Sequence, residues 1–239
     1  AKFRDVIVCV HPGDVEAAKR EGIQPKQQLL SIPNGVDIVS FDAQLLTREI
    51  ARETLELRKT DFIFGSIANF YPAKDLPNFI LATKRYRELG GMGIVAIIGD
   101  GPLRTETEKA IQVAGAESFF ILLGSKENAS QYLAAFDVCA LPSAKEGMPI
   151  SLLEAMAASL PCIVSDVGAM RWMIEPDAGL IVEARNPELL ARAMLRLERD
   201  PDSREAFGAQ ARRVVIERFP LQKTLEAHEK ILTLPKQAI

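Results

Sequence analysis

The chain has few histidines and cysteines, and it has neither a long apolar run nor an excess of one charge. With only His11 and His228 among 239 residues, a multi-histidine metal centre is effectively excluded. The three cysteines lack C-x-x-C spacing and are expected to be reduced thiols inside a core. No apolar run approaches the roughly 18–20 residues of a membrane-spanning helix, and the first residues do not have the pattern of a secretory signal peptide.

Acidic and basic side chains nearly balance, at 32 and 29, which gives a net charge of −3 at pH 7. This balance excludes a broad basic surface of the kind that binds nucleic acid. An anionic small ligand stays compatible with it, because a phosphate site needs only a few local donors and one or two cations. The sequence therefore predicts a cytoplasmic protein with no nucleic-acid partner.

Short apolar runs alternate with segments of helical spacing through most of the chain. Strands are expected at 62–67, 94–98, 119–122, 138–141, 162–165 and 180–182. Helices are expected at 77–89, 103–114, 128–135, 150–159, 187–198, 203–217 and 221–232. The strands are apolar throughout, as expected when helices cover both faces of a parallel sheet. This order predicts an α/β fold: a doubly wound parallel sheet with C-terminal helices.

The N-terminal part of the sequence has a different organisation. The expected elements are a strand, a helix capped by Asp14, a second strand, a turn, and a polar linker with a surface helix, at 6–10, 14–21, 29–32, 33–37 and 38–60. A strand–helix–strand piece cannot form its own core, and the sequence begins at Ala1 without methionine. We therefore expect residues 1–37 to be the tail of a missing N-terminal domain plus a linker. Residues 38–239 are expected to form the main domain.

Three of the loops that follow strands contain unusual residues, and in a doubly wound sheet such loops bind ligands. In the loop 68–75, Lys74 precedes a helix, where an ammonium group could face a bound diphosphate, although a surface lysine would look the same. The turn at 99–102 is not a dinucleotide fingerprint, because Arg104 stands in place of the third glycine. Gly124 ends a strand, which indicates a close turn or the close approach of a planar base.

The most informative loop follows the strand at 138–141, where Glu146 and Gly147 precede an apolar helix that begins near Ile150. Because that helix is expected to be buried, Glu154 needs a partner. The partner is either a distant arginine or the hydroxyl groups of a ligand. Gly147 leaves room for an anion at the free N–H groups of the helix start. The segment can therefore bracket a phosphate between two polyols, which is the layout of a nucleotide sugar.

Together these motifs resemble the C-terminal donor-binding domain of a retaining glycosyltransferase of the GT-B class, family 4 type (glycosyl transferases group 1). The resemblance is carried by the E-x7-E segment from Glu146 to Glu154 and, in the family's order, by IPNGVD, ANFYPAKD, GDGP, LLG and YLAAFDVCALPS. It implies the Rossmann-like half of a GT-B fold and transfer of a hexosyl group from a nucleotide sugar such as a UDP- or GDP-sugar. The acceptor would be an unknown sugar or lipid-linked molecule, with peripheral membrane contact in the latter case.

The resemblance also implies roles for individual residues. Glu154 would bond the ribose hydroxyls, and Glu146 would contact hydroxyls of the transferred sugar. Lys74 would balance the diphosphate, so that neither a cofactor nor a metal is expected, and Glu146 and Lys74 are the predicted catalytic residues. Asn69 stands where the family commonly has a second cation, an arginine. The other predicted donor-binding residues are Gly124, Gly147, Met148 and Ile150.

Two alternative functions would be expected with the same fold or with the same donor site as a glycosyltransferase. A GT-B-fold nucleotide-sugar 2-epimerase would need acid–base carboxylates and histidines that are not found at matching spacing. A non-catalytic nucleotide-binding module would keep the donor site without the transfer reaction. His11 lies where the family usually has serine, and it is interpreted as a structural residue at a helix start. Because the acceptor-binding domain of the same protein would be missing, this chain is expected to be inactive alone.

Overall fold

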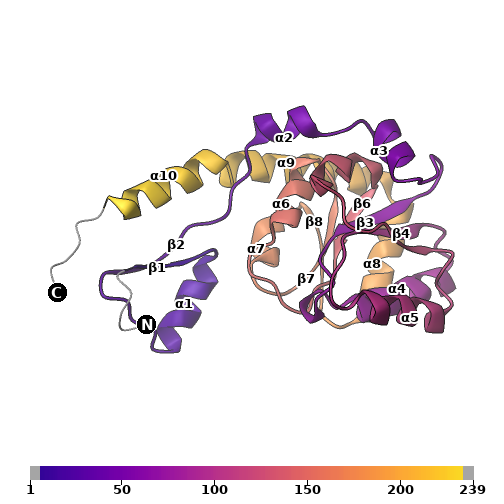
Figure 1. Ribbon diagram of the computed structural model, residues 1–239, viewed down its shortest axis with the longest axis horizontal. Coiled ribbons are helices and arrows are strands. Elements are labelled where there is room, and N and C mark those ends of the chain that lie inside the picture. The colour runs from indigo at the N-terminus through magenta and orange to yellow at the C-terminus, as the bar shows by residue number, and fades with distance from the viewer. Residues whose placement is uncertain (1–5, 234–239) are drawn as a thin grey trace.

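The computed structural model describes residues 6–233. An α/β body is built on a six-stranded parallel sheet, and a small strand–helix–strand unit lies beside it (Figure 1). The strand order of the sheet is β5-β4-β3-β6-β7-β8. Its strands are β3 (Ile63–Ile67), β4 (Ile94–Ile98), β5 (Phe120–Leu122), β6 (Val138–Leu141), β7 (Cys162–Ser165) and β8 (Gly179–Val182). The predicted doubly wound parallel sheet is confirmed.

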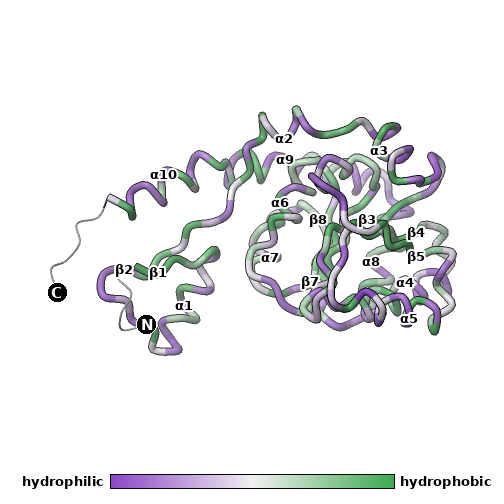
Figure 2. Tube along the Cα trace, in the orientation of Figure 1, coloured by the Kyte–Doolittle hydropathy of each residue, from purple (hydrophilic) through white to green (hydrophobic). Residues whose placement is uncertain are grey.

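Helices cover both faces of this sheet. One face is covered by α4 (Leu76–Glu88), α5 (Arg104–Ala114) and α8 (Pro187–Arg199). The other is covered by α2 (Ile38–Gln44), α3 (Arg48–Thr54), α6 (Ile150–Ala157), α7 (Met170–Ile174), α9 (Pro201–Arg218) and the 3-10 helix η2 (Ala129–Ala135). Successive residues of a strand point to opposite faces, so Ile63 lies in one core cluster and Phe64 in the other. The strands are accordingly mostly apolar, with Ser66 in β3 and Ser165 in β7 as exceptions (Figure 2).

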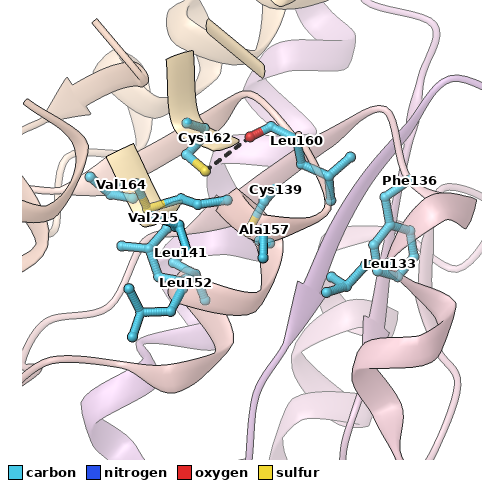
Figure 3. Close-up of a cluster of buried hydrophobic side chains, with 14 of the residues drawn as sticks. Leu133, Phe136, Cys139, Leu141, Leu152, Ala157, Leu160, Cys162, Val164 and Val215 are labelled. Atoms are coloured by element: carbon cyan, nitrogen blue, oxygen red, sulfur yellow. Dashed lines mark hydrogen bonds between the residues drawn. The ribbon is translucent and has the colours of Figure 1, made fainter. Parts of the chain in front are cut away.

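The core between the sheet and α6 is packed tightly. Side chains of β6 and β7 meet those of α6 and α9 in this layer, among them Cys139, Leu141, Cys162, Val164, Leu152 and Val215 (Figure 3). Cys139 and Cys162 are buried free thiols, whereas Cys9 is only partly buried. Nearby, Gly65 allows the ring of Phe136 to lie against β3, because an added Cβ would come within 1.9 Å of that ring. A larger residue at position 65 would therefore displace the ring.

Two local expectations were wrong, and a third expected helix is of the 3-10 type. The segment 38–60 forms two helices instead of one, because Asp37 caps α2 and Thr47 caps α3 with their side chains. The segment 128–135 forms the 3-10 helix η2, with hydrogen bonds such as Gln131 N to Asn128 O at 2.9 Å. The N-terminal helix α1 (Pro12–Arg20) is capped by His11 and not by Asp14, because Pro12 starts the helix two residues earlier than expected. The interpretation of His11 as a helix-start residue is thereby confirmed.

A buried arginine fixes the linker helices to the body. Arg52 of α3 is 1% exposed. Its Nε donates to the carbonyl of Ala135 at 2.8 Å, and a terminal nitrogen donates to Asp137 at 3.0 Å. The other terminal nitrogen donates to the carbonyls of Arg58 and Lys59. Arg52 therefore joins α3 to the end of η2, to the residue before β6 and to the segment that leads into β3.

The N-terminal unit consists of the parallel strands β1 (Val6–Cys9) and β2 (Gln28–Ser31) with α1 packed against them. The last helix, α10 (Leu221–Leu232), leaves the body and runs beside this unit (Figure 1). Thr224 of α10 donates to the carbonyl of Pro33 at 2.9 Å. Across residues 6–233, no helix is both long and apolar enough to span a membrane.

Candidate functional site

The loops after β3 and β6 meet where the strand order of the sheet reverses. From β3 the chain proceeds to β4 on one side, and from β6 to β7 on the other, which is the point where open α/β sheets bind ligands. The loop after β3 contains the 3-10 turn η1 (Pro72–Lys74). The backbone N–H groups of Ala144 and Lys145 both donate to the carbonyl of Ala73, at 2.8 and 3.2 Å. These bonds hold the two loops together.

The structure brings the two predicted catalytic residues into direct contact. Lys74 Nζ lies 2.5 Å from Glu146 Oε1, and the Ser143 hydroxyl donates to the same oxygen at 2.7 Å. The side chains of Lys74 and Glu146 are 19% and 10% exposed, so the ion pair lies mostly out of water. Ser143 could be recognised in the sequence only by its place three residues before Glu146.

Close packing of the backbone fixes the Glu146 loop. Gly168 has a φ of +54°, and an added Cβ there would lie 2.1 Å from the carbonyl oxygen of Glu146. Ala169 N donates to the carbonyl of Gly147 at 2.9 Å. At Gly147 itself an added Cβ would meet only a methyl group of Val10, at 3.7 Å. The glycine at 147 is therefore not required by the packing of the free protein, and it faces open space toward the N-terminal unit.

Met148 is tied to the linker between the two parts of the chain. The amide nitrogen of the Asn34 side chain donates to the carbonyl of Met148 at 2.9 Å, and the backbone N–H of Asn34 lies 3.3 Å from the Met148 sulfur. The sequence analysis treated Asn34 only as a turn residue. Because Met148 is 5% exposed and its carbonyl is engaged, only its N–H group remains for the predicted contact with a ligand.

The first backbone N–H groups of α6 are free to donate hydrogen bonds to a ligand. Pro149 precedes the helix and supplies no N–H group or side-chain cap. The N–H groups of Ile150 and Ser151 have no acceptor within the helix, since they belong to its first turn. The side chain of Ile150 is 57% exposed. Any role of Ile150 in binding would therefore come from its backbone.

A cavity of about 250 Å³ opens at this end of the sheet. It is lined by Ile67, Ala68, Asn69, Lys74, Ile98, Gly99, Ser125, Lys126, Ala129 and Ser151. Asn69 and Lys74 thus share one cavity with the start of α6. Lys126, which the sequence analysis did not single out, is the second cationic side chain among the described residues that line it.

The glycine turns beside the cavity have structural roles. An added Cβ would lie 2.0 Å from the Ala68 carbonyl oxygen at Gly99, and 2.7 Å from Phe70 N at Gly101. Gly124 has a φ of +71°, and its carbonyl accepts from Gly99 N at 2.9 Å. Close contact between neighbouring loops therefore explains the glycines at 99 and 101. Gly124 is brought next to the cavity through this bond.

Glu154 lies one turn into α6, three residues after Ser151 and so on the same side of the helix. Its pKa is raised above the ordinary value of 4.5 by burial, and a hydrogen bond from the Ser130 hydroxyl opposes this shift. Within residues 6–233, Glu154 forms no ion pair, so the alternative of a distant arginine is not supported. Glu154 does not itself line the cavity; it lies one turn beyond Ser151, which does, and its partly buried carboxylate retains free acceptor capacity.

We also searched the described residues for side chains that could bind a metal ion. Among residues 6–233, no group of three or more His, Cys, Asp or Glu side chains is placed to hold a metal ion. The charged groups that the site does contain are two lysines and two glutamates.

The six-stranded parallel sheet with helices on both faces has the fold of GT-B glycosyltransferase structures. Residues 47–214 match the family "Glycosyl transferases group 1". Because this match covers well over half of the chain, the chain belongs to that family.

Named relatives are similar along most of the chain. It is 29% identical over 204 residues to the UDP-Gal:alpha-D-GlcNAc-diphosphoundecaprenol alpha-1,3-galactosyltransferase of Escherichia coli, which covers 84% of this chain and 53% of that protein. It is 26% identical to the N-acetyl-alpha-D-glucosaminyl L-malate synthase of Bacillus anthracis, covering 95% of this chain and 59% of that one. The chain thus spans between half and three-fifths of the length of these relatives.

Solved structures have the same fold. The sucrose-phosphate synthase of Thermosynechococcus elongatus matches with a TM-score of 0.81 and 24% identity, over 95% of this chain and 58% of that one. HepE of Anabaena in complex with UDP-glucose matches with a TM-score of 0.83 and 19% identity, over 96% of this chain and 64% of that one. None of these four proteins is an epimerase by name.

Proposed function

We propose that this chain is the donor-binding half of a retaining glycosyltransferase that takes a hexosyl group from a nucleotide diphosphate sugar. The observation that carries the proposal is the Lys74–Glu146 pair at the topological switch point of the sheet. It puts a cation and a hydroxyl acceptor side by side, beside the open start of α6. Glu154, with free acceptor capacity one turn further along α6, supplies the third element of a nucleotide-sugar site.

Lys74 is assigned to the leaving group. In the reaction, the bond between the anomeric carbon and the diphosphate oxygen breaks, and its electron pair leaves with the nucleoside diphosphate. A fixed ammonium group and the N–H groups at the start of α6 stabilise the negative charge that develops there. In this scheme the protein supplies the counter-charge itself and needs no metal ligands.

The remaining residues bind the two ends of the donor. Glu146 accepts hydrogen bonds from hydroxyls of the transferred sugar, and Glu154 accepts them from the ribose. The open space at Gly147 and the N–H groups of Met148 and Ile150 accommodate the sugar and phosphate groups. Gly124 and its neighbour Ser125 border the end of the cavity where the base would lie.

Lys126 is assigned to the charge that Asn69 cannot supply. Asn69 can donate a hydrogen bond to a phosphate but has no charge. Lys126 lines the same cavity as Asn69 and Lys74, and among the described residues it forms no ion pair. Its flexible side chain can therefore turn toward the diphosphate without breaking another contact.

For the nucleotide base and the sugar acceptor, we propose candidate classes. UDP is the first candidate nucleotide, because HepE, which has the same fold, is described with UDP-glucose. A GDP-sugar is the second candidate. The acceptor is a sugar or a lipid-linked molecule, and in the latter case the protein would act from the cytoplasm at the membrane surface.

We also propose that residues 1–37 belong to a second lobe that binds the acceptor, and that the donor domain comprises residues 38–239. No described residue of β1 or β2 is fully buried, and the matched relatives are longer than this chain. Without an acceptor groove and a closed cleft, the chain should bind donor but transfer sugar slowly or not at all. Near-normal transfer by this chain alone would contradict the proposal.

The test is a calorimetric panel of UDP, GDP and ADP with their nucleosides, on the wild type and on Lys74→Ala. The substitution should weaken diphosphate binding by about 1.5–3 kcal/mol, the range for hydrogen bonds to charged groups, and should leave nucleoside binding unchanged. Lys109→Ala, which removes an exposed lysine on α5, is the matched control. Equal losses for diphosphate and nucleoside would show that Lys74 does not contact the diphosphate.

Two further measurements test the reaction itself. With a second lobe present, NMR of the product should show the same anomeric configuration as the donor. Transfer should persist in EDTA, because Lys74 supplies the counter-charge. Inverted product, or complete loss of transfer in EDTA, would contradict the retaining or the metal-free part of the proposal.

A further inference from the structure

In the free protein, Lys74 and Glu146 neutralise each other. Lys74 Nζ is 2.5 Å from Glu146 Oε1, which also accepts from the Ser143 hydroxyl at 2.7 Å. Both charged side chains are largely withdrawn from solvent, at 19% and 10% exposure. A mostly buried pair is screened by salt much less than a surface pair. A ligand must therefore compete with this contact.

The contact is built into the backbone. The carbonyl of Ala73, next to Lys74, accepts two N–H groups from the loop that contains Glu146. Gly168 lies directly against the carbonyl of Glu146, at a position where no Cβ would fit. The loops therefore hold Lys74 and Glu146 opposite each other, so the pair is formed before any ligand arrives.

Donor and product differ in how they can replace the contact. A nucleotide sugar offers its diphosphate to Lys74 and its sugar hydroxyls to Glu146, so each charged group gains a new partner. A bare nucleoside diphosphate offers an anion to Lys74 only. It leaves Glu146 mostly buried, without its cation and facing a second negative charge, which is unfavourable.

We propose that the Lys74–Glu146 pair makes the site select a nucleoside diphosphate that still carries its sugar over the bare nucleoside diphosphate. The inference rests on the proposed donor site. After the sugar has been transferred, Glu146 loses its hydroxyl partners and returns to Lys74, which displaces the diphosphate. The same two side chains thus favour binding of the donor before the reaction and release of the nucleoside diphosphate after it.

The test is the Glu146→Gln variant, measured by calorimetry with UDP and UDP-glucose, and with the GDP pair if the panel selects guanine. Glutamine keeps the size of the side chain and frees Lys74. UDP should bind about tenfold tighter than to the wild type, while UDP-glucose should bind no tighter or more weakly. An equal change for both ligands, or no gain for UDP, would overturn the proposal.

A double-mutant cycle separates this effect from simple repulsion between Glu146 and the phosphates. In the Lys74→Ala background, Glu146→Gln should change UDP affinity less than twofold, because the cation that it frees is gone. Ligand-detected NMR titration extends the measurement to weak binding. A full tenfold gain in that background would show repulsion alone and overturn the proposal. Glu127→Gln, an exposed carboxylate next to Lys126, is the matched control and should change UDP affinity less than twofold.

The outcomes also separate this inference from the proposed function. If no nucleotide binds, or if Lys74→Ala leaves UDP binding unchanged, the donor site and the selectivity both fail. If Lys74→Ala weakens UDP binding but Glu146→Gln gives no gain, the donor site stands and the selectivity by the ion pair is overturned.

Discussion

The α/β body and the N-terminal unit are made of the same kinds of element but differ in what they bury. Every residue of β4, β6 and β7 is buried, whereas no described residue of β1 or β2 is. The body has helices on both faces of its sheet. In the N-terminal unit α1 packs against the strands, yet Val8 in β1 remains 37% exposed. The body therefore has a core of its own, whereas β1 and β2 bury little of their surface, which agrees with the proposal that they belong to a second lobe.

Most of the candidate site lies in the body, and the N-terminal unit contributes little to it. The charged groups, the cavity and the start of α6 all belong to the body. From the N-terminal unit and linker, Val10 comes near Gly147 and Asn34 donates to Met148. We therefore expect nucleotide binding to be a property of the body alone, and we expect the proposed second lobe to be needed for acceptor binding.

The largest expected effect is on the stability of the body. Arg52→Ala removes the buried cation that holds α3 against η2 and leaves Asp137 without one of its partners. We expect a loss of about 3–5 kcal/mol in the free energy of unfolding, measured with urea. Lys19→Ala breaks an exposed pair with Glu16 in the N-terminal unit and should cost less than about 0.5 kcal/mol. Similar losses in the two variants would contradict the contrast between the regions.

The next effect concerns ligand binding by the body. Glu154→Gln keeps the shape of the side chain but removes a charged acceptor beside the cavity. Nucleoside diphosphate affinity should fall by about 1.5 kcal/mol, roughly tenfold. The melting temperature of the free protein should stay level or rise, because the ionised carboxylate is partly buried without a cation. A large drop in melting temperature with unchanged affinity would show a structural role instead.

The pH dependence of this variant has a definite sign. The pKa of Glu154 is raised in the folded protein, so the folded state binds the proton more tightly than the unfolded state does. The wild type is therefore penalised once the pH rises above the unfolded value near 4.5, and the full penalty is reached above the folded pKa. Any stability advantage of Glu154→Gln should be present at pH 7 and vanish below about pH 4. An advantage that grows toward low pH would contradict the raised pKa.

The body was predictable from the sequence because its signals are local and repeated. Strands such as 94–98 are apolar along their whole length, and Glu154 in an apolar helix pointed to a ligand or a distant partner. The errors lie where side chains cap or tighten short segments. Asp37 and Thr47 start two helices where one was expected, and His11 caps α1 in place of Asp14.

Several features of the site could not be predicted, because they depend on contacts between segments far apart in the sequence. Lys74 and Glu146 were identified separately, but no spacing rule indicates that two residues 72 positions apart in the sequence are in contact. Lys126 and Ser143 have ordinary surface or loop signals, and only the fold places them at the cavity or on Glu146. Asn34 resembled a turn residue, yet its side chain holds Met148.

A smaller effect is expected for Lys126, the second cationic side chain of the cavity. Lys126→Ala should weaken nucleoside diphosphate binding by about 1 kcal/mol, because an exposed, flexible lysine contributes less than the mostly buried Lys74. Adding Asn69→Arg should restore the affinity by returning a cation to the same cavity. Lys145→Ala, an exposed lysine in the neighbouring loop that does not line the cavity, is the control. An equal loss in both single variants would indicate a general effect of charge.

The smallest expected effect is in the N-terminal unit. Val8→Ala shortens a side chain that is 37% exposed and should change the free energy of unfolding by less than about 0.5 kcal/mol. The matched change in the body, Val95→Ala in β4, removes two methyl groups from a fully buried position and should cost about 2–3 kcal/mol. A loss above 1 kcal/mol for Val8→Ala, roughly twice the surface limit, would mean that this face already contributes to a core. In a longer protein that contains the proposed second lobe, the same face would be covered, and Val8→Ala should then cost as much as Val95→Ala. An unchanged small cost there would place Val8 on the surface of the complete protein and argue against packing of that lobe on β1 and β2.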